Sequence, residues 1–484
     1  MRWLARAQSE VAAQWREKLN RVVIRIPSQN QAIVDTLRTA LAHILITRDG
    51  VELRPGTRSY ARSWIRDGAM MSESLARLGH IDAASAYLRW YAQQLFANGK
   101  VPCCVDARGA DPVPENDSAG EFLFLAATVY RYTGDTALLA GLWPKIEAAT
   151  AYLETLRQSE RTPENLAPDR RALYGLVPAS ISHEGYSDKP VHSYWDDFWA
   201  LKGYGAALEI ALALDRSEAA QAITKQRDEF RRDLAVSLNA TIDAQALAYL
   251  PGSAELGDFD PTSSAIALSP EGDPDLLPKT ALGETYERYW REFVGRRDAR
   301  TAWREYTPYE LRNVSVFVRL GFRDRAQEAL AFFLAGRLPP PWNQWPEVVA
   351  REIRKPRFVG DVPHGWVASD FIRAALDLLA YERERDRAIV LAAGVPETWL
   401  DAAGVEVKGL ATPYGPLSYS LRGEGDRILL TIGAIARVPP GGFVFARPAR
   451  RPPGPALVNG EQVDWTGEEL RVLTAPAEVV IPRR

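Results

Sequence analysis

Acidic residues recur near the ends of several long, loop-like stretches, each time beside aromatic, arginine or histidine residues. The segments SWIRDGAM (63–70), PENDSAGEF (114–122), SYWDDFW (193–199) and WNQWPEVV (342–349) show the pattern. Cleavage of a glycosidic bond needs two carboxyl groups: one protonates the leaving oxygen, and the other activates water or attacks the sugar. Aromatic rings suit the apolar faces of a sugar. We therefore interpret these segments as a candidate carbohydrate site.

A simpler interpretation applies to any single acid among them. Asp at a helix start accepts hydrogen bonds from free backbone N–H groups and complements the helix dipole. Such N-caps explain Asp117, Asp135 and Asp260 well. They explain less well why aromatic, arginine and histidine residues accompany the acids in loop after loop.

The elements that must position these residues are helices. Apolar periodicity predicts twelve of them up to about residue 385. They lie near 30–47, 67–78, 81–97, 118–132, 135–158, 195–213, 216–239, 262–269, 280–293, 308–320, 323–336 and 365–385.

The connections between these helices alternate in kind. Short turns stand at 78–82, 132–136, 213–218 and 320–325, whereas the long connections are 48–66, 98–117, 159–194, 240–261, 294–307 and 337–364. Alternate connections of an up-down array share one end, so the long loops should converge on one face. Six hairpins closed in a ring make an (α/α)6 barrel. An open solenoid is the alternative, but the uneven spacing and the lack of a repeated motif favour the barrel.

The pattern changes after about residue 390. Short alternating runs such as GVEVKGL, GPLSYSLRG and DRILLTIG, separated by Gly and Pro, predict strands. The sequence thus predicts a mainly α protein: an N-terminal helical segment (1–25), an (α/α)6 barrel (26–388) and a small all-β, sandwich-like C-terminal domain (389–484).

Composition excludes several classes of function. The 484 residues are 46% hydrophobic and 25% charged, which is ordinary for a folded protein, and the length suits two or three domains. The formal net charge of -3 gives no basic excess for nucleic acid or an anionic membrane. No apolar run approaches the roughly 18 residues of a membrane helix. The N-terminal segment lacks the apolar centre of a secretory signal, so we expect a cytoplasmic protein.

The only two cysteines, Cys103 and Cys104, are adjacent. Neighbouring cysteines close a strained ring, and metal sites usually draw on spaced Cys and His residues. We therefore expect neither a stabilising disulfide nor a metal site, and no cofactor.

The ordered motifs resemble the six-hairpin glycosidases, most of all the glucoamylase family and more loosely the α-L-rhamnosidases. WIRDG (64–68) resembles the glucoamylase segment whose Arg and Asp hold the terminal sugar, and SYWDDFWALKGY (193–204) the segment with the general acid, where that family has Glu-Glu. WNQWPEVV with PHGWVASDFI (363–372) resembles the late segments of both families, in which a Glu supplies the base. The β-type tail is similar to that of rhamnosidase-like chains. RSYARSWIRDGAM (58–70) also resembles bacterial barrel proteins, a likeness that assigns no substrate.

The resemblance and the residues together imply a glycoside hydrolase acting on an oligo- or polysaccharide, exo-acting and inverting. Asp196 is the predicted general acid, with Asp197 as its close alternative, and Glu347 is the predicted base, with Glu310 next in line. Arg66 and Asp67 should grip the non-reducing-end sugar, unless Arg66 pairs with Asp67 or Glu115 structurally. The predicted substrate-binding residues are Trp64, Arg66, Asp67, Glu115, Asp117, His183, Glu184, Tyr194, Trp195, Glu310, Trp342, Trp345, His364 and Trp366.

Other activities on the same barrel stay open from sequence. A sugar epimerase would use paired histidines, and His183, His192 and His364 all fall in long loops. A phosphorylase would replace the base with phosphate-binding groups, which the presence of Glu347 argues against. A polysaccharide lyase would need a basic pocket, whereas these loops are mostly acidic. A non-catalytic carbohydrate-binding scaffold is the last alternative.

Overall fold

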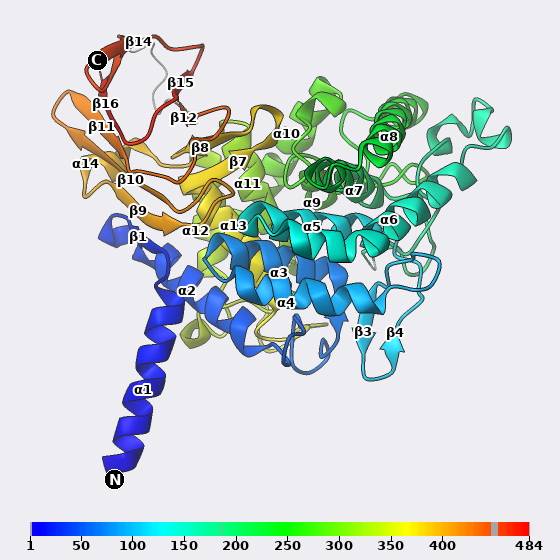
Figure 1. Cartoon of the computed structure of the whole chain (residues 1–484), viewed down its shortest axis with the longest axis horizontal. Coiled ribbons are helices and arrows are strands. Elements are labelled where there is room, and N and C mark those ends of the chain that lie inside the picture. Colours follow the sequence, from blue (N-terminus) through cyan, green and yellow to red (C-terminus); the bar gives the residue numbers. More distant parts are fainter. Residues whose placement is uncertain (1, 184, 447–453, 484) are drawn as a thin grey trace.

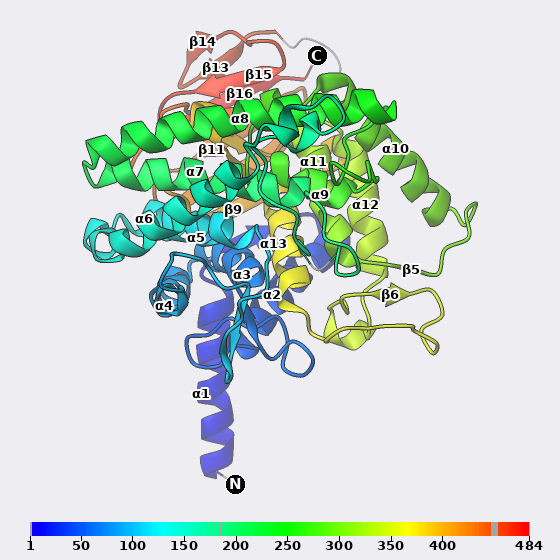
Figure 2. The same cartoon turned by 90° about the vertical axis from the view of Figure 1, so that its right-hand side faces the viewer.

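The computed structural model describes residues 2–183, 185–446 and 454–483. A body of helices carries a β part along one edge, and the first helix, α1 (Arg2–Leu19), projects away from both (Figures 1 and 2). Within the described residues, no helix has the length and apolar character needed to cross a membrane.

The helical body consists of two concentric sets of helices. The inner set is α3 (Ile65–Arg77), α5 (Ser118–Thr133), α7 (Tyr194–Ala213), α9 (Pro261–Ser264), α11 (Arg312–Arg319) and α13 (Gly365–Leu379). The outer set is α2 (Gln31–Ile46), α4 (Ile81–Tyr91), α6 (Thr136–Ser159), α8 (Ser217–Gln245), α10 (Lys279–Arg297) and α12 (Arg323–Ala335). Each inner helix contacts the next in chain order, and α13 returns to contact α3, so these contacts form a closed cycle.

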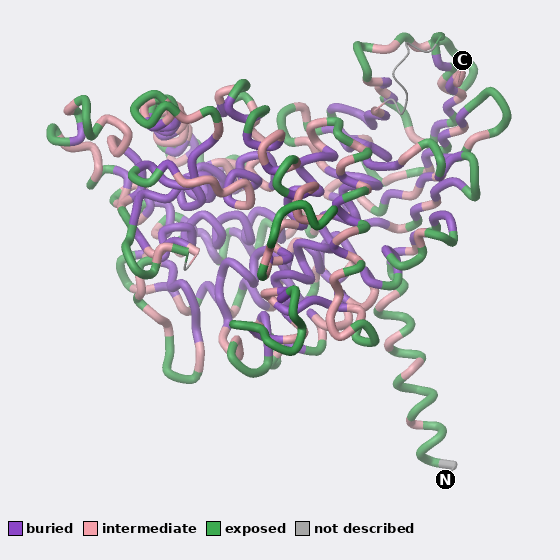
Figure 3. Tube along the Cα trace, turned by 180° about the vertical axis from the view of Figure 1, so that it is seen from behind, coloured by how far each residue is buried: buried purple, intermediate pink, exposed green. Residues whose placement is uncertain are grey.

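Burial distinguishes the two sets. Every residue of α13 is buried, as is nearly all of α3, whereas α8 buries a single stripe of side chains. A helix that is buried on all sides must lie inside other helices, and a one-sided apolar stripe marks an outer helix. In Figure 3, the buried segments of the chain, drawn in purple, lie inside the helical body.

Two glycines allow α5 and α7 to approach closely. A Cβ on Gly120 would lie 2.0 Å from the backbone oxygen of Trp199, and a Cβ on Gly203 would lie 2.7 Å from the Cα of Gly120. Any side chain at either position would push the two helices apart. This contact sets the spacing of the helices that carry Asp117 and Asp196.

The long connections all lead into the starts of inner helices, as the sequence indicated. One hairpin differs from the expectation: the helix predicted near 262–269 is the single turn α9, continued by a 3₁₀ turn at Ala265–Ala267. Its link to α10 is not a short turn. Pro270, Pro274 and Pro278 in that link remove backbone donors and prevent the helix from continuing.

The β part contains two main sheets. Seven strands pair in the order β1 (Val23–Arg25), β9 (Val405–Leu410), β10 (Leu417–Glu424), β11 (Arg427–Ile432), β16 (Ala477–Pro482), β13 (Ala456–Val458) and β14 (Glu461–Val463). Four pair in the order β15 (Glu469–Val472), β12 (Phe443–Ala446), β8 (Ala388–Leu391) and β7 (Ala380–Arg383). The short helix α14 (Glu397–Asp401) joins β8 to β9.

The edges of this part differ from the sequence expectation. Residues 23–25 form a strand that pairs antiparallel with β9, so the N-terminal segment is not helical throughout. The last helix ends at Leu379 rather than near residue 385, and β7 follows it directly. Alternating burial along short strands is hard to separate from a helix end in sequence alone.

Two further small sheets lie among the long loops. One contains β2 (Ser63–Trp64), β3 (Cys104–Asp106) and β4 (Gly109–Ala110), and the other pairs β5 (Glu305–Tyr306) with β6 (Val349–Ala350). They join the loops that lead into α3, α5, α11 and α13, and so fix the ends of these loops relative to one another.

Candidate active site

A cavity of about 160 Å³ lies where the long loops meet the first turns of the inner helices. Its wall combines aromatic rings, two carboxyl groups and two arginines. The carboxyl groups are Asp67 and Glu347, and the arginines are Arg66 and Arg312. These four residues come from three different loops or helix starts, so only the folded ring brings them together.

Glu347 is held by two tyrosine hydroxyls. Tyr309 donates to its Oε1 at 3.0 Å, and Tyr60 donates to its Oε2. The Tyr60 segment is fixed in turn by the buried carboxylate of Asp361, which accepts hydrogen bonds from the backbone N–H groups of Arg58, Ser59 and Tyr60. Burial and the neighbouring Glu347 raise the pKa of Tyr309 well above its usual value, so it stays a donor.

Arg66 lies in the first turn of α3 and also lines the cavity. Its Nη1 donates to Glu115 Oε2 at 2.6 Å and to Asp117 Oδ2 at 3.0 Å. Burial alone would lower the pKa of Arg66, but these carboxylates raise it well above its usual value. The structural pairing of Arg66 with Glu115, left open by the sequence, is therefore present, and Asp67 beside it lines the cavity.

Asp117 occupies the N-cap position of α5, as its place in the sequence suggested, but its side chain does not cap the helix. Its side chain makes no capping hydrogen bond; besides Arg66, it accepts a hydrogen bond from Trp195 Nε1 at 2.8 Å. Asp135 and Asp260, by contrast, do cap α6 and α9. Asp117 instead orients Arg66 and the Trp195 ring at the cavity.

Glu121 lies one turn beyond Asp117 on the same face of α5. It is fully buried, and neither carboxyl oxygen has a hydrogen-bond partner among the described residues. Burial and the nearby Asp117 raise its pKa well above the usual value, which favours the protonated form of Glu121.

The two adjacent acids of α7 face different surroundings. Asp196 accepts hydrogen bonds from Ser180 Oγ at 2.6 Å and Ser182 Oγ at 2.7 Å. Asp197 accepts one from the backbone N–H of Val177 at 3.0 Å. Both are fully buried, and neither lines the cavity.

Burial also sets the protonation of this pair. It raises the pKa of Asp197 to about 8. Burial and then Asp117 raise the pKa of Asp196 well above its usual value, which favours the protonated form of its carboxyl group. The two side chains are about 100° apart on the helix, which accounts for their separate partners. Asp196 lies directly behind the wall segment Ser182–His183.

Three aromatic rings lie around the guanidinium of Arg312, which lines the cavity. Its guanidinium carbon lies 4.7 Å from the Trp366 ring centre, 4.9 Å from that of Tyr309 and 5.0 Å from that of Trp195. Arg312 also forms an ion pair with Asp370 at 3.0 Å. Trp366 and Tyr309 line the cavity, whereas Trp195 is buried behind them.

A further part of the cavity wall consists of two hydroxyl side chains and a histidine. Thr262 and Ser263, at the start of α9, line the cavity with His183, and Ser263 Oγ lies 3.2 Å from His183 Nε2. Burial lowers the pKa of His183. Glu184, predicted from sequence at this point, lies outside the described residues.

The remaining predicted residues divide between wall and core. Trp64 and His364 line the cavity. His364 Nδ1 accepts the backbone N–H of Val367, and burial lowers its pKa to about 3. Tyr194 is fully buried, with its hydroxyl between Ser237 and Thr241.

Three further predicted residues do not line the cavity. Trp345 is fully buried and donates to the backbone oxygen of Phe333. Trp342 is exposed. Glu310 is bound by Arg296 and Tyr289 away from the cavity, where it joins α10 to the turn that leads into α11. None of the three therefore forms part of the cavity wall.

Sequence reasoning did not assign Tyr60, Tyr309, Arg312, Thr262, Ser263 and Thr307, which also line the cavity. Tyr60, Tyr309 and Arg312 stand in the same acid- and aromatic-rich loops as the predicted residues, and this was their available signal. Thr262 and Ser263 follow the capping Asp260 in ordinary helix-start sequence, which carries no such signal.

A larger cavity, of about 1120 Å³, opens at the other end of the ring, between the inner helices and the β part. None of the predicted site residues lines it. Several of its acids are ion-paired: Asp377, for example, binds Arg77 at 2.9 Å and Arg319 at 3.0 Å. The carboxyl groups that the sequence singled out lie at or near the smaller cavity instead.

The sequence matches no protein-family model and no curated protein. Solved structures do match in fold. An α-L-rhamnosidase from Dictyoglumus thermophilum aligns with a TM-score of 0.59 at 10% identity over 95% of this chain and 50% of its own. The Streptomyces avermitilis α-L-rhamnosidase, complexed with L-rhamnose, aligns with a TM-score of 0.57 at 15% identity over 95% of this chain and 41% of its own.

A glycosidase solved in complex with glucose has a TM-score of 0.55 at 14% identity, covering 73% of this chain and 99% of its own. The chain therefore spans about half the length or less of these two rhamnosidases, but nearly the whole of this glycosidase. The similarity shows a shared fold, a helical toroid with a β part in the two rhamnosidases. A particular closeness to the glucoamylase family stays a prediction.

Proposed function

We propose that the chain is a glycoside hydrolase whose active site is the small cavity at the loop end of an (α/α)6 barrel. The observation that carries the proposal is Glu347: a carboxylate on the cavity wall, held by two tyrosine hydroxyls, in the same cavity as Arg66 and Asp67. The closed cycle of inner-helix contacts supports the barrel. The fold of the rhamnosidases and glycosidases supports the reaction class.

The size of the cavity favours exo action. Its 160 Å³ is well below the roughly 300–1,000 Å³ of sites for drug-sized ligands, and it suits a single sugar ring. Trp64 and Trp366 offer aromatic faces, and Arg66, Asp67 and Arg312 offer partners for hydroxyls. We therefore propose that the terminal sugar of an oligo- or polysaccharide binds here.

In the proposed reaction, Glu347 acts as general base. It takes a proton from water as that water attacks the anomeric carbon, and a protonated acid on the other side gives its proton to the leaving oxygen. The fixed tyrosine partners hold the Glu347 carboxylate in one orientation. We propose inversion, because the base and the acid come from distant hairpins and leave room for water between sugar and base.

Asp196 is the proposed general acid, supported by its raised pKa and its place behind the Ser182–His183 wall. It contacts a sugar only if Ser182 turns away when substrate binds. Asp67 is the second candidate, because its side chain already lines the cavity. Asp197 is the weakest of the three, since its carboxylate is bound to Val177.

The histidines bear on the epimerase alternative. His192 lies between Glu160 and Glu255 and does not line the cavity. His183 and His364 do line it, and His364 uses Nδ1 to cap α13. Hydrolysis of a glycoside would distinguish the proposed function from epimerisation by these two histidines.

The test is release of a monosaccharide from a panel of neutral glycosides, with the first anomer followed by NMR. The proposal expects hydrolysis without phosphate and release of the anomer opposite to that of the substrate. Release of the same anomer would contradict inversion and make Glu347 a nucleophile. Cleavage that requires phosphate would indicate a phosphorylase, and no cleavage of any glycoside would favour a binding scaffold.

A further inference from the structure

The side chains of the two cysteines lie close together in the long loop that leads into α5. Successive residues of a strand point to opposite faces of a sheet. Cys104 begins β3, but the chain bends at Cys103, and the two Sγ atoms lie 3.0 Å apart. Both thiols are buried and pack against Trp64 of the cavity wall.

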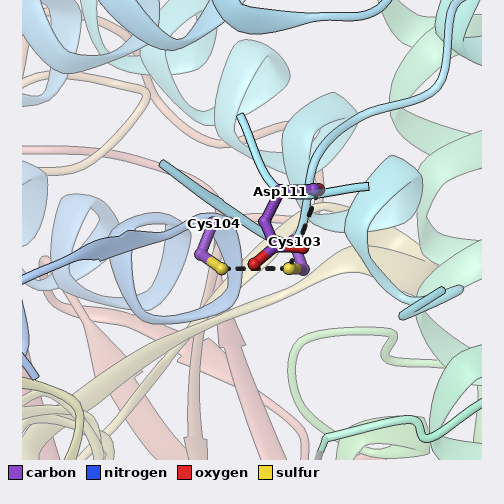
Figure 4. A group of neighbouring side chains, drawn as sticks. All are labelled: Cys103, Cys104 and Asp111. Carbon is purple, nitrogen blue, oxygen red and sulfur yellow. Dashed lines mark hydrogen bonds between the residues drawn. The ribbon is translucent and has the colours of Figure 1, made fainter. Parts of the chain in front are cut away.

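The carboxylate of Asp111 lies beside the two thiols. Asp111 directly follows β4, and its backbone N–H donates to the Cys104 oxygen at 2.9 Å, which brings its side chain back over β3. One ligand atom from each of Cys103, Cys104 and Asp111 lies within 4.8 Å of the others. Figure 4 shows the three side chains turned toward one another.

We propose that Cys103, Cys104 and Asp111 bind one thiophilic divalent cation of the Zn²⁺ type. Two thiolates with one carboxylate are ligands that Zn²⁺ accepts, and a water completes four-coordination. The Asp111 carboxylate is held in place, because Arg62 Nη2 donates to its Oδ2 at 2.8 Å and the backbone N–H of Val113 donates to its Oδ1 at 3.1 Å. With the ion bound, two thiolates and one carboxylate balance the ion together with Arg62.

Both thiols are buried, and the Asp111 side chain is partly exposed, so the carboxylate is the ligand that faces solvent. A bound ion would join β3 to the chain that follows β4, directly behind Trp64. The site is separate from the sugar cavity and does not depend on the proposed hydrolysis. Its expected effect is on the stability of the wall that Trp64 forms.

The test uses the full chain without a histidine tag, freed of metal under a thiol-free reductant. Co²⁺ is the spectroscopic probe, and Zn²⁺ is titrated in competition with a chromogenic chelator. We expect one ion per chain, a thiolate-to-cobalt charge-transfer band, and a higher melting temperature with Zn²⁺. The Cys103→Ser and Cys104→Ser variants should lose the band, and Asp111→Asn should weaken Zn²⁺ binding at least 10-fold.

Asp106→Asn is the matched control, because Asp106 is also bound by Arg62 but lies outside the three ligands. It should leave Zn²⁺ affinity within about 2-fold. Absence of the charge-transfer band in the wild-type protein would overturn the proposal. Equal losses in Asp106→Asn and Asp111→Asn would also overturn it, since charge alone would then explain binding. Circular dichroism of each variant separates lost binding from lost folding.

Discussion

Carboxyl groups at the two ends of the helical ring can have different kinds of partner, as Asp377 at one end and Glu347 and Asp196 at the other show. At the end that faces the β part, Asp377 lies between Arg77 and Arg319, and these charges lower its pKa against the effect of burial. At the loop end, Glu347 and Asp196 accept hydrogen bonds from neutral tyrosine and serine hydroxyls. Ion pairs lock a carboxylate in place, whereas hydroxyl partners leave it able to exchange a proton.

The two ends also differ in the volume of their cavities, and the larger cavity is not the one with the predicted catalytic residues. The paired end has a cavity of about 1120 Å³, and the loop end one of about 160 Å³. Perturbed titratable groups in a concave site mark function better than volume does. If this contrast is right, carboxyl substitutions at the loop end should remove activity, and those at the paired end should remove stability.

The largest expected effect is on turnover, from Glu347→Gln. Loss of a positioned base typically costs roughly 10²–10⁴-fold in rate. We expect kcat to fall by that amount with the melting temperature nearly unchanged, measured on the glycoside that the wild type cleaves best. Glu352→Gln is the matched control, because Glu352 is exposed on the same loop. Equal activity of the two variants would remove Glu347 from the mechanism.

Asp377→Asn tests the comparison at the end that faces the β part, where we expect a loss of stability and not of activity. Removing one partner of a buried ion pair costs about 3–5 kcal/mol, because the arginines keep uncompensated charge. Denaturant unfolding should show this loss, while the folded fraction retains wild-type kcat/KM. A variant of normal stability and no activity would place the chemistry at the larger cavity instead.

The acid is identified by three substitutions measured together. Asp196→Asn should lower kcat by roughly 10²–10⁴-fold, with a smaller loss for Asp197→Asn, whose carboxylate binds Val177. Substrates whose leaving group needs no protonation should restore activity to the variant that lacks the acid. Restoration in Asp67→Asn rather than Asp196→Asn would transfer the role to the residue that already lines the cavity.

His192 gives the loop end a pH dependence of stability. Burial would lower its pKa, but hydrogen bonds to the carboxylates of Glu160 and Glu255 raise it to about 9. Because the folded-state pKa exceeds the unfolded value, this contribution is complete below pH 6.5 and is lost as the pH rises through about 9. It amounts to no more than about 3 kcal/mol.

Stability measured from pH 6 to 10 should therefore fall more steeply in the wild type than in His192→Gln. The two curves should converge above pH 9. Parallel curves across this range would mean that His192 is neutral in the folded protein, and that its two glutamates do not hold a proton on it.

The smallest expected effect is that of Tyr60→Phe. Losing one hydrogen bond to a carboxylate costs about 1.5–3 kcal/mol, part of which water in the cavity can replace. We expect kcat to fall about 10-fold and KM to stay near its wild-type value. Loss of activity as complete as in Glu347→Gln would show that Tyr60 contacts substrate directly.

Much of the architecture follows from the sequence, because apolar periodicity and long acid-rich loops are local signals. Glu347, Asp67 and Trp366 were predicted in this way and share one cavity. Trp345 and Glu310 stand in the same loops, yet one is core and the other is paired with Arg296. The direction of a loop side chain depends on contacts that no local pattern contains.

Tyr60 shows the same limit at long range. Its position depends on Asp361, about three hundred residues later, which binds the backbone at Arg58, Ser59 and Tyr60. The position of Tyr60 becomes visible only when distant segments are placed together. The turn at α9 has a local cause instead, because prolines in the following link outweigh the apolar pattern that predicted a longer helix.

The most direct test of the central claim is a crystal structure of Glu347→Gln soaked with the sugar that the wild type releases. The account predicts one sugar ring in the loop-end cavity, between Trp64 and Trp366, with its hydroxyls on Arg66 and Asp67. The amide of residue 347 should lie on the side from which water attacks. A sugar bound in the larger cavity beside Asp377, with the loop-end cavity empty, would contradict it.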